Sequence, residues 1–261
     1  MNDRNDPSVP ADSTPGGGRA ALLDRHRWLG FVLPLAVFML VGSLEPKPGD
    51  SPGALGIRYA WYPIVYTLKI ALVLLAVAFV WPAYRSFPFR VSRLALGVGA
   101  VGAVVWIGIC ELELERRLLV PLGLEWFVAS GARTAFDPFE QWARHGTAAV
   151  WCFVAIRFVG LAVAVPIVEE VFLRGFVMRF VMDARWWAIP FGRVNATAVV
   201  VGTLVPMLMH PAELLAAAVW FSMITWLMVK TRSLWDCIAA HAVTNLLLGG
   251  YVLLAGRWHL W

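Results

Sequence analysis

The chain has few cysteines and long stretches without charge. Its three cysteines, Cys110, Cys152 and Cys237, lie in or beside apolar stretches at no metal-ligand spacing. This placement argues against a disulfide framework and is typical of small buried apolar residues. Hydrophobic residues make up 60% of the 261 residues, whereas about 45–50% is usual for soluble domains. The composition therefore argues against a soluble protein.

The sequence also lacks a basic stripe with exposed aromatic residues. The net charge of +5 would be compatible with a nucleic-acid partner, but the arginines gather at the ends of apolar runs. Such a distribution follows the positive-inside rule of membrane proteins. We therefore expect the lipid bilayer as a partner and no nucleic acid.

Apolar residues form seven runs along the chain. A transmembrane helix needs about 20 mostly apolar residues. The runs cover residues 28–44, 60–80, 94–110, 147–168, 194–209, 212–229 and 234–255. They predict an all-α, polytopic membrane helix bundle of about seven to eight transmembrane helices.

The remaining segments are polar. Residues 1–20 are rich in Pro, Gly, Ser and Asp, which predicts a disordered N-terminal tail. No signal-peptide cleavage site follows the first run, which leads into Glu45-Pro46-Lys47-Pro48. Residues 111–145 predict an extramembrane loop with one or two amphipathic segments on the membrane surface. We thus divide the chain into three parts: the tail (1–20), the N-terminal transmembrane helices with the extramembrane loop (21–145), and a C-terminal core (146–256).

Basic residues predict the orientation of the chain. If seven helices alternate, one side of the membrane holds Arg25, Arg27, Arg85, Arg90, Arg93, Arg174, Arg179, Arg185, Arg193, Lys230 and Arg232. This side is cytoplasmic by the positive-inside rule. We expect a multi-pass protein of the cell inner membrane with a cytoplasmic N-terminus.

Two adjacent carboxylates, Glu169 and Glu170, follow the fourth run. Polar side chains within a bilayer are costly, so each is expected to have a partner or a function. Neighbours on a helix point about 100° apart, so these two acids have different roles. Glu170 and Arg174 are spaced i and i+4, which favours a structural ion pair. Glu169 faces elsewhere, and a carboxylate in apolar surroundings takes up protons readily, as a general base must.

Histidines supply the other half of the candidate site. His241 and Asn245 are also spaced i and i+4, so they share one helix face. Both side chains can donate hydrogen bonds without a full charge, as an oxyanion hole requires. His210 precedes Pro211 at an expected helix break and could orient a water. Each residue alone could be structural, but their occurrence together favours an active site.

These motifs resemble those of the CAAX prenyl protease type II family, which also includes bacteriocin-processing membrane proteins. The similarity rests on Glu-Glu-x-x-x-Arg at 169–174, a later histidine, and His-x-x-x-Asn at 241–245, and it covers roughly residues 150–250. It implies helices around an intramembrane cavity and peptide hydrolysis by a glutamate-activated water in the 146–256 core. The resemblance implies the following roles: Glu169 as the base, His210 as a water ligand, His241 and Asn245 as oxyanion donors, and Glu170 and Arg174 as residues that shape the site.

The stretch at 165–175 is similar to a bacterial subgroup associated with exosortase. One departure from the family concerns its middle motif, Phe-x-x-x-His, because Pro206 stands four residues before His210. Straight alternating helices would place His210 far from Glu169. We therefore predict a break at Pro206 or at His210-Pro211 that brings His210 to the middle of the membrane.

Several alternatives stay open at this point. Arg157 in the fourth run forms a buried ion pair or binds a substrate carboxylate, and Lys69 pairs with a carboxylate or reaches toward the membrane surface. We expect no cofactor, but Glu169, His210 and His241 could bind zinc with one open position. A non-catalytic transporter or scaffold is a further alternative. The expected substrate is a membrane-associated peptide or protein, and the sequence does not say whether it is prenylated.

Overall fold

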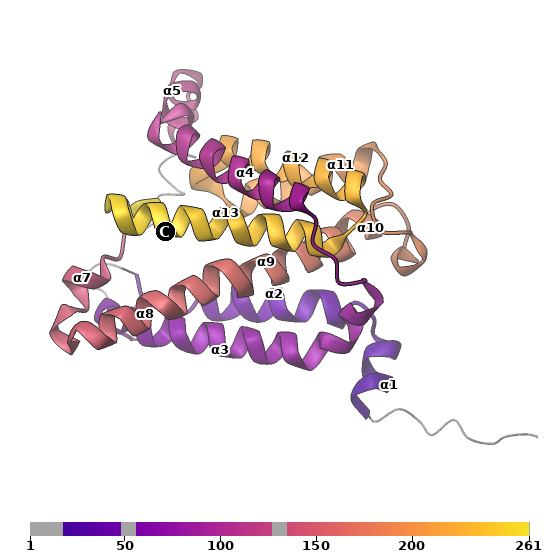
Figure 1. Cartoon of the computed structure of the whole chain (residues 1–261), viewed down its shortest axis with the longest axis horizontal. Helices are drawn as coiled ribbons and strands as arrows, with labels where there is room; N and C mark the ends of the chain where they lie inside the picture. The colour runs from indigo at the N-terminus through magenta and orange to yellow at the C-terminus, as the bar shows by residue number, and fades with distance from the viewer. Residues whose placement is uncertain (1–17, 48–55, 127–134, 261) are drawn as a thin grey trace, which may run out of the picture.

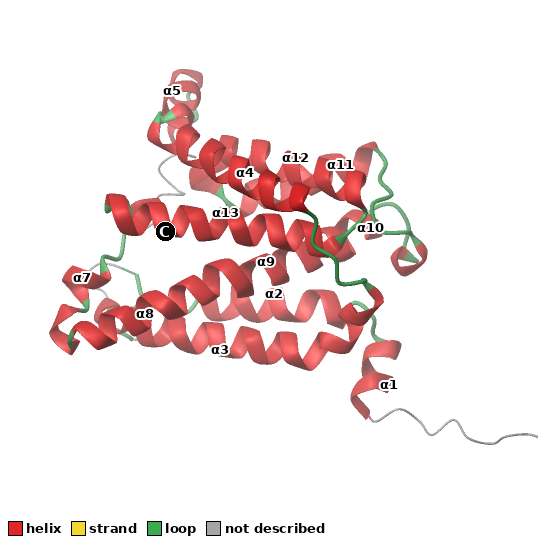
Figure 2. Cartoon of the chain, viewed as in Figure 1, coloured by secondary structure: helices red, strands yellow, loops and turns green. Residues whose placement is uncertain are grey.

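The computed structural model describes residues 18–47, 56–126 and 135–260, and these residues form helices and loops without a strand (Figure 2). This confirms the predicted all-α class. The longer helices are α2 (Leu29–Gly42), α3 (Tyr62–Val80), α4 (Arg93–Glu111), α8 (Thr147–Val159), α11 (Ala196–Met209), α12 (Leu214–Thr231) and α13 (Leu234–Ala255). The shorter ones are α1 (Gly18–Arg25), α5 (Leu114–Leu119), α7 (Pro138–Gln141), α9 (Val165–Glu170) and α10 (Met178–Phe180).

All seven predicted apolar runs are helical, but fewer of them are long enough to cross a membrane. Five helical stretches are long and apolar enough: Tyr59–Ser86, Arg93–Glu111, Thr147–Phe180, Pro211–Thr231 and Leu234–Ala255. A sixth is added if α1 and α2, which meet at a 93° bend, count as one. The predicted number of seven to eight is therefore too high within the described residues. The missing span is α11, which has only 14 residues because it ends before Pro211.

Of the seven predicted runs, the fourth differs most in length from the helical stretch in the structure. A continuous helical stretch covers Thr147–Phe180, although we expected the run to end at residue 168. It contains two π-helical segments, η5 (Gly160–Ala164) and η6 (Val171–Val177). Arg174 therefore lies inside a span, not beyond its end as predicted. The reason is its ion pair with Glu170 (Arg174 Nε to Glu170 Oε2, 3.3 Å), which lets both charges stay buried.

The helices form two groups with α13 between them (Figure 1). The first group contains α2, α3, α8 and α9, and the second contains α4, α11 and α12. Small residues allow α13 to approach α4 closely, because a Cβ atom at Gly99 would lie 2.5 Å from the Ala240 carbonyl oxygen. A chain of hydrogen bonds crosses this interface: Trp220 Nε1 donates to Thr244 Oγ1 (3.0 Å), and the Thr244 hydroxyl donates to the Gly99 carbonyl (2.8 Å).

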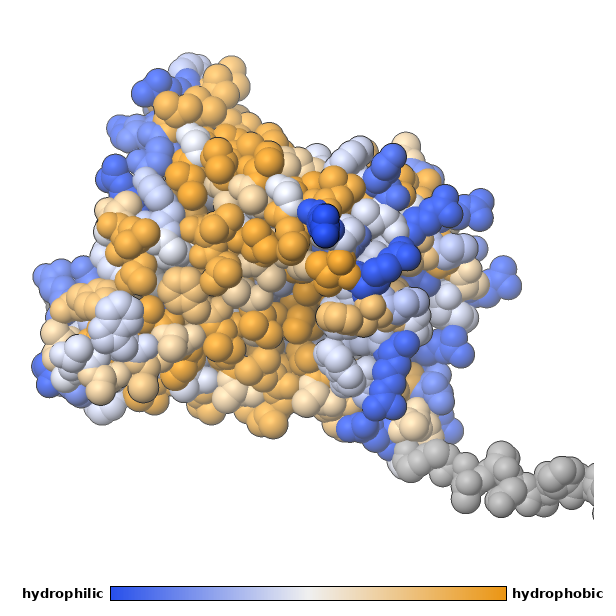
Figure 3. All heavy atoms as spheres, viewed as in Figure 1, coloured by the Kyte–Doolittle hydropathy of each residue, from blue (hydrophilic) through white to orange (hydrophobic). Residues whose placement is uncertain are grey.

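The surface agrees with a membrane-embedded bundle. The face in Figure 3 is hydrophobic across the middle and hydrophilic at both ends. The start of α4, helices α1 and α10, and the loop after α10 lie at one end of the molecule (Figure 1). Of the basic residues predicted to share one side, Arg27, Arg90, Arg179 and Arg232 line a single cavity at this end. We refer to it as the arginine-rich end.

Two predicted segments need correction or lie outside the structure. Residues 1–17 of the predicted disordered tail are outside the described residues, but residues 18–20 belong to α1 and are not disordered. The apolar side chain of Leu23, which is buried, gives α1 a packing face. The predicted extramembrane stretch contains the short helices α5 and α7, and its residues 127–134 are not among the described ones.

Candidate active site

The four residues predicted to be catalytic line one cavity of about 530 Å³. Glu169 comes from the end of α9, His210 from the turn between α11 and α12, and His241 and Asn245 from α13. Segments separated by as many as 76 positions in the sequence thus meet at one place. Glu170, although adjacent to Glu169, does not line this cavity. The predicted separation of the two carboxylates is therefore confirmed in the geometry.

Glu170 lies in a fully buried polar cluster. Its side chain is 0% exposed. Oε1 accepts a hydrogen bond from His241 Nδ1 at 3.0 Å, and Oε2 lies 3.3 Å from Arg174 Nε. The predicted ion pair with Arg174 is present, and His241 is a second partner that the sequence did not reveal. Glu170 thus connects the helix of the two glutamates to α13.

Arg174 closes the cluster on its inner side. Its Nη2 donates to the Phe221 carbonyl at 3.0 Å and lies 3.4 Å from the Thr225 hydroxyl, so it also ties α12 to the cluster. The side chain is 0% exposed. Burying two charges is costly even when they are paired, and the loss of one partner leaves the other uncompensated. The cluster therefore holds the site together only while it is complete.

His241 has one nitrogen in the cluster and its ring against the cavity. Nδ1 donates to the Glu170 carboxylate, so Nε2 is the acceptor nitrogen of a neutral ring and a second donor of a protonated ring. The ring packs edge-on against Trp220, with 4.5 Å between ring centroids. The orientation of His241 is thus fixed by a carboxylate and an aromatic side chain.

His210 lies at the predicted helix break. Helix α11 contains Pro206 but continues through it and ends at Met209, so the break is at His210-Pro211. The backbone N–H of His210 donates to Met207, and the Pro206 carbonyl, which an α-helix would pair with that N–H, instead accepts from His210 Nδ1 at 2.9 Å. This bond places the proton on Nδ1 and makes Nε2 the acceptor nitrogen of the neutral ring.

Asn245 is held by an irregularity in the facing helix. In the π-helical segment η5 the N–H of Val165 bonds to the Gly160 carbonyl, and the next residue, Pro166, has no N–H to donate. The Leu161 carbonyl therefore has no helical donor and accepts from Asn245 Nδ2 at 2.9 Å. Irregular π segments of this kind are frequent at functional sites. The second N–H of the Asn245 amide remains available for another acceptor.

A second polar group lines the wall of the cavity away from α12. Lys69 pairs with Glu45 (Nζ to Oε1, 2.6 Å), as one of the two predictions for Lys69 required. Arg157 donates to the Tyr62 hydroxyl and lies over the Tyr66 ring at 4.8 Å. Glu45 and Tyr62 were not predicted as neighbours of the site, because Glu45 follows α2 and Tyr62 begins α3, both far in sequence from the C-terminal motifs. The signal was Lys69, a charge in an apolar run, which requires a carboxylate partner.

The geometry does not favour the zinc alternative. Within residues 18–47, 56–126 and 135–260, no three His, Cys, Asp or Glu side chains are grouped as a metal site requires. A larger cavity of about 830 Å³ at the arginine-rich end contains none of the predicted site residues, which line the smaller cavity or lie beside it.

The comparison with known families covers the part of the chain that holds this site. A family model described as type II CAAX prenyl endopeptidase Rce1-like matches residues 149–247. This segment belongs to the Rce1-like family. The Rce1-like segment includes every predicted site residue, from Arg157 to Asn245, and leaves out α2, α3 and α4. No curated protein and no solved structure matches the chain.

The family that this segment matches is one of endopeptidases, and the match identifies the chain as an enzyme. The apolar helices place this protease in a membrane with several crossings. The family match thus confirms the resemblance to type II CAAX proteases. It reaches the family as a whole and does not extend to the exosortase-associated subgroup.

Proposed function

We propose that the chain is an intramembrane endopeptidase in which Glu169 activates a water for attack on a peptide bond. The observation that carries the proposal is the shared cavity, where Glu169 faces the same space as His210, His241 and Asn245. Glu170 is turned away and paired with His241 and Arg174. Only one of the two adjacent carboxylates can therefore reach a substrate.

The reaction begins with a water between Glu169 and His210. Glu169 accepts a proton from this water, while the acceptor nitrogen of His210 orients it through a second hydrogen bond. The hydroxide oxygen bonds to the carbonyl carbon of the substrate, and the carbonyl oxygen becomes an oxyanion. The carbon–nitrogen bond then breaks as Glu169 returns its proton to the leaving amine. The products are a carboxylic acid and an amine, so that one water is consumed.

The oxyanion is stabilised by donors on α13. His241 donates through Nε2 when both of its ring nitrogens carry a proton, while Glu170 holds Nδ1. Asn245 donates through the N–H that is not bonded to Leu161. Removal of one such donor typically slows catalysis by about 10²- to 10³-fold. In this account Glu170 and Arg174 shape the site by orienting His241.

We propose that the substrate is a membrane-anchored peptide or protein tail. Arg157 and the Tyr62 hydroxyl lie on the wall of the same cavity and offer donors suited to a carboxylate, such as a peptide C-terminus. A prenylated peptide and a bacterial membrane-protein tail or leader peptide both fit this proposal, and the resemblance at 165–175 to the exosortase-associated subgroup concerns the second. We also propose that the N-terminus and the arginine-rich end face the cytoplasm of a cell with an inner membrane.

The test of the function is cleavage of membrane-anchored reporter peptides by the purified protein in lipid bilayers. Reporters with a free or amidated C-terminus, each with and without a prenyl group, would be compared by mass spectrometry of the products. The wild type should release a defined fragment, and amidation should weaken cleavage if Arg157 binds the carboxylate. A protein that cleaves no reporter, while it removes or transports the peptide intact, would support the transporter alternative.

The metal-free mechanism has its own test. Elemental analysis of the purified protein, together with assays after chelation, distinguishes it from zinc chemistry. We expect no stoichiometric zinc and full activity in the presence of a chelator. Tightly bound zinc at one per chain, lost together with activity, would contradict the glutamate mechanism as written.

A further inference from the structure

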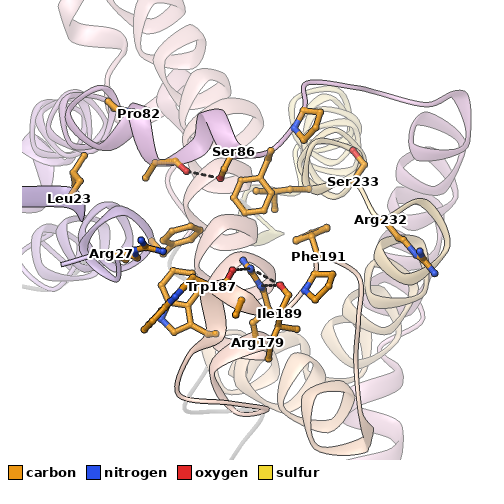
Figure 4. A pocket seen from close by; sticks show the side chains of 18 of the residues that line it. Leu23, Arg27, Pro82, Ser86, Arg179, Trp187, Ile189, Phe191, Arg232 and Ser233 are labelled. Atoms are coloured by element: carbon orange, nitrogen blue, oxygen red, sulfur yellow. Dashed lines mark hydrogen bonds between the residues drawn. The ribbon is translucent and has the colours of Figure 1, made fainter. Parts of the chain in front are cut away.

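The cavity at the arginine-rich end is distinct from the active-site cavity. It has a volume of about 830 Å³, and the two cavities have no lining residue in common. Its walls come from α1, the segment after α3, the loop between α10 and α11, and the start of α13. Figure 4 shows Arg179 between these walls, with Arg27 and Arg232 on opposite sides of it. The mechanism above does not use any of these residues.

Positive charge dominates the lining. Arg27, Arg90, Arg179 and Arg232 line the cavity, and the single carboxylate among the lining residues is Asp24. Within the described part of the chain, none of the four arginines forms an ion pair. Cations gathered around one hollow without enough carboxylates attract an anion.

Arg179 is the most informative of the four. It is only 8% exposed. Its guanidinium donates to backbone carbonyls of Gly175 (3.0 Å), Trp187 (3.2 Å) and Ile189 (2.7 Å). Carbonyl groups satisfy the N–H donors but carry no net charge. A buried cation with neutral partners alone favours an anion nearby, because charge in a low-dielectric site is costly when it is uncompensated.

The cavity is held open by hydrogen bonds between its own walls. Ser233 donates to the Arg90 carbonyl at 3.0 Å, and the Trp235 indole donates to the Phe87 carbonyl at 3.1 Å. Both bonds fix the segment after α3 to the start of α13. The backbone of Arg90 is therefore held in place before any ligand binds, which lowers the ordering cost of binding.

Aromatic side chains stand beside the arginines. Arg27 lies over the Trp187 ring, with 5.3 Å from its central carbon to the ring centroid. Phe31, Trp186 and Phe191 also line the cavity. A ligand that suits this lining carries an anionic group and apolar chains. The position at the ends of the membrane helices is where lipid headgroups and aromatic belts occur.

We propose that this cavity binds the phosphate headgroup of an anionic phospholipid, with acyl chains against its aromatic walls. The positive-inside distribution of arginine by itself does not require such a site. Arg85, Arg93 and Arg193 belong to the same predicted basic side of the membrane but do not line the cavity. The four arginines of the cavity are thus a subset of the basic residues, selected by position.

The test compares lipid retention by variants that differ only in which arginines are neutralised. Wild type, Arg27→Gln/Arg90→Gln and Arg85→Gln/Arg193→Gln would be reconstituted with phosphatidylglycerol and phosphatidylcholine, and bound lipid measured by native mass spectrometry. All four substituted residues are exposed, so folding should be preserved, and reporter cleavage checks it. We expect preferential retention of phosphatidylglycerol, weakened by about tenfold or more in the first variant and unchanged in the second.

Two outcomes would overturn the proposal. Equal retention of phosphatidylglycerol by both double variants would show that the cavity arginines do not bind it. A second contrary outcome concerns inorganic phosphate at millimolar concentration. If it displaces the lipid completely and protects the protein against unfolding as well as the lipid does, the site binds a free phosphate. Retention of phosphatidylglycerol in the presence of millimolar phosphate supports the lipid.

Discussion

At the scale of single residues, Glu169 and Glu170 differ only in where their helix directs them. One lines the cavity, and the other is buried between His241 and Arg174. The i, i+4 spacing of Glu170 and Arg174 made their ion pair predictable, because it is local. The bond between Glu170 and His241 joins residues 71 positions apart, and no local spacing encodes it. The sequence therefore predicted the members of the site better than their contacts.

Glu170→Gln is expected to reduce stability strongly. The substitution keeps the side-chain size but leaves Arg174 buried without its countercharge, which costs about 3–5 kcal/mol for a broken buried pair. Unfolding in detergent, followed by circular dichroism, measures the effect. Glu140→Gln on the exposed surface of α7 is the matched control and should stay within about 0.5 kcal/mol of wild type. Equal stability of both variants would contradict a structural role of the ion pair.

At the scale of helices, irregular segments position two residues of the site, Asn245 and His210. The π segment η5 and Pro166 together leave the Leu161 carbonyl for Asn245. The end of α11 at His210-Pro211 brings His210 to the cavity. The sequence predicted this break from Pro211 but not the π segment, since the geometry depends on which donor the carbonyls find. The expected length of the fourth run was too short for the same reason: paired charges allowed the helix to continue.

Pro166→Ala is expected to separate stability from activity. Alanine restores an N–H beside Leu161 and favours a regular helix, which should maintain stability or increase it by up to about 3 kcal/mol. Asn245 would then compete for its acceptor, so turnover should fall by about tenfold or more as the oxyanion donor loses its orientation. Reporter cleavage and thermal unfolding of the same preparation test both effects. Wild-type turnover in this variant would contradict the positioning of Asn245 by η5.

Gly99→Ala is expected to weaken the contact between α4 and α13. Its new Cβ would lie 2.5 Å from the Ala240 carbonyl oxygen, so the helices must move apart at a cost of about 1–3 kcal/mol. Gly97→Ala on the same helix meets nothing within 4 Å and provides the control, which should keep its stability or gain up to about 1 kcal/mol because alanine favours a helix. Both are measured by thermal unfolding. A similar loss in both variants would contradict the close approach at Gly99 as the cause of the effect.

At the scale of the whole molecule, the active-site cavity is built by more of the chain than the family segment. Residues 149–247 supply Glu169 and the α13 residues, whereas Lys69 and Tyr62 on α3 complete the opposite wall. The all-α class and the order of the helices were predictable from apolar runs. The position of the cavity was not, because it depends on how helices distant in sequence pack around α13.

The most direct test of the account is the turnover of Glu169→Gln beside that of Glu140→Gln in the same bilayers. Glutamine keeps the shape of Glu169 but cannot accept the proton of water, so turnover should fall by about 10²- to 10⁴-fold. Binding of the reporter and thermal stability should stay close to wild type, and Glu140→Gln should cleave at the wild-type rate. Cleavage by Glu169→Gln at the wild-type rate would contradict the assignment of Glu169 as the base.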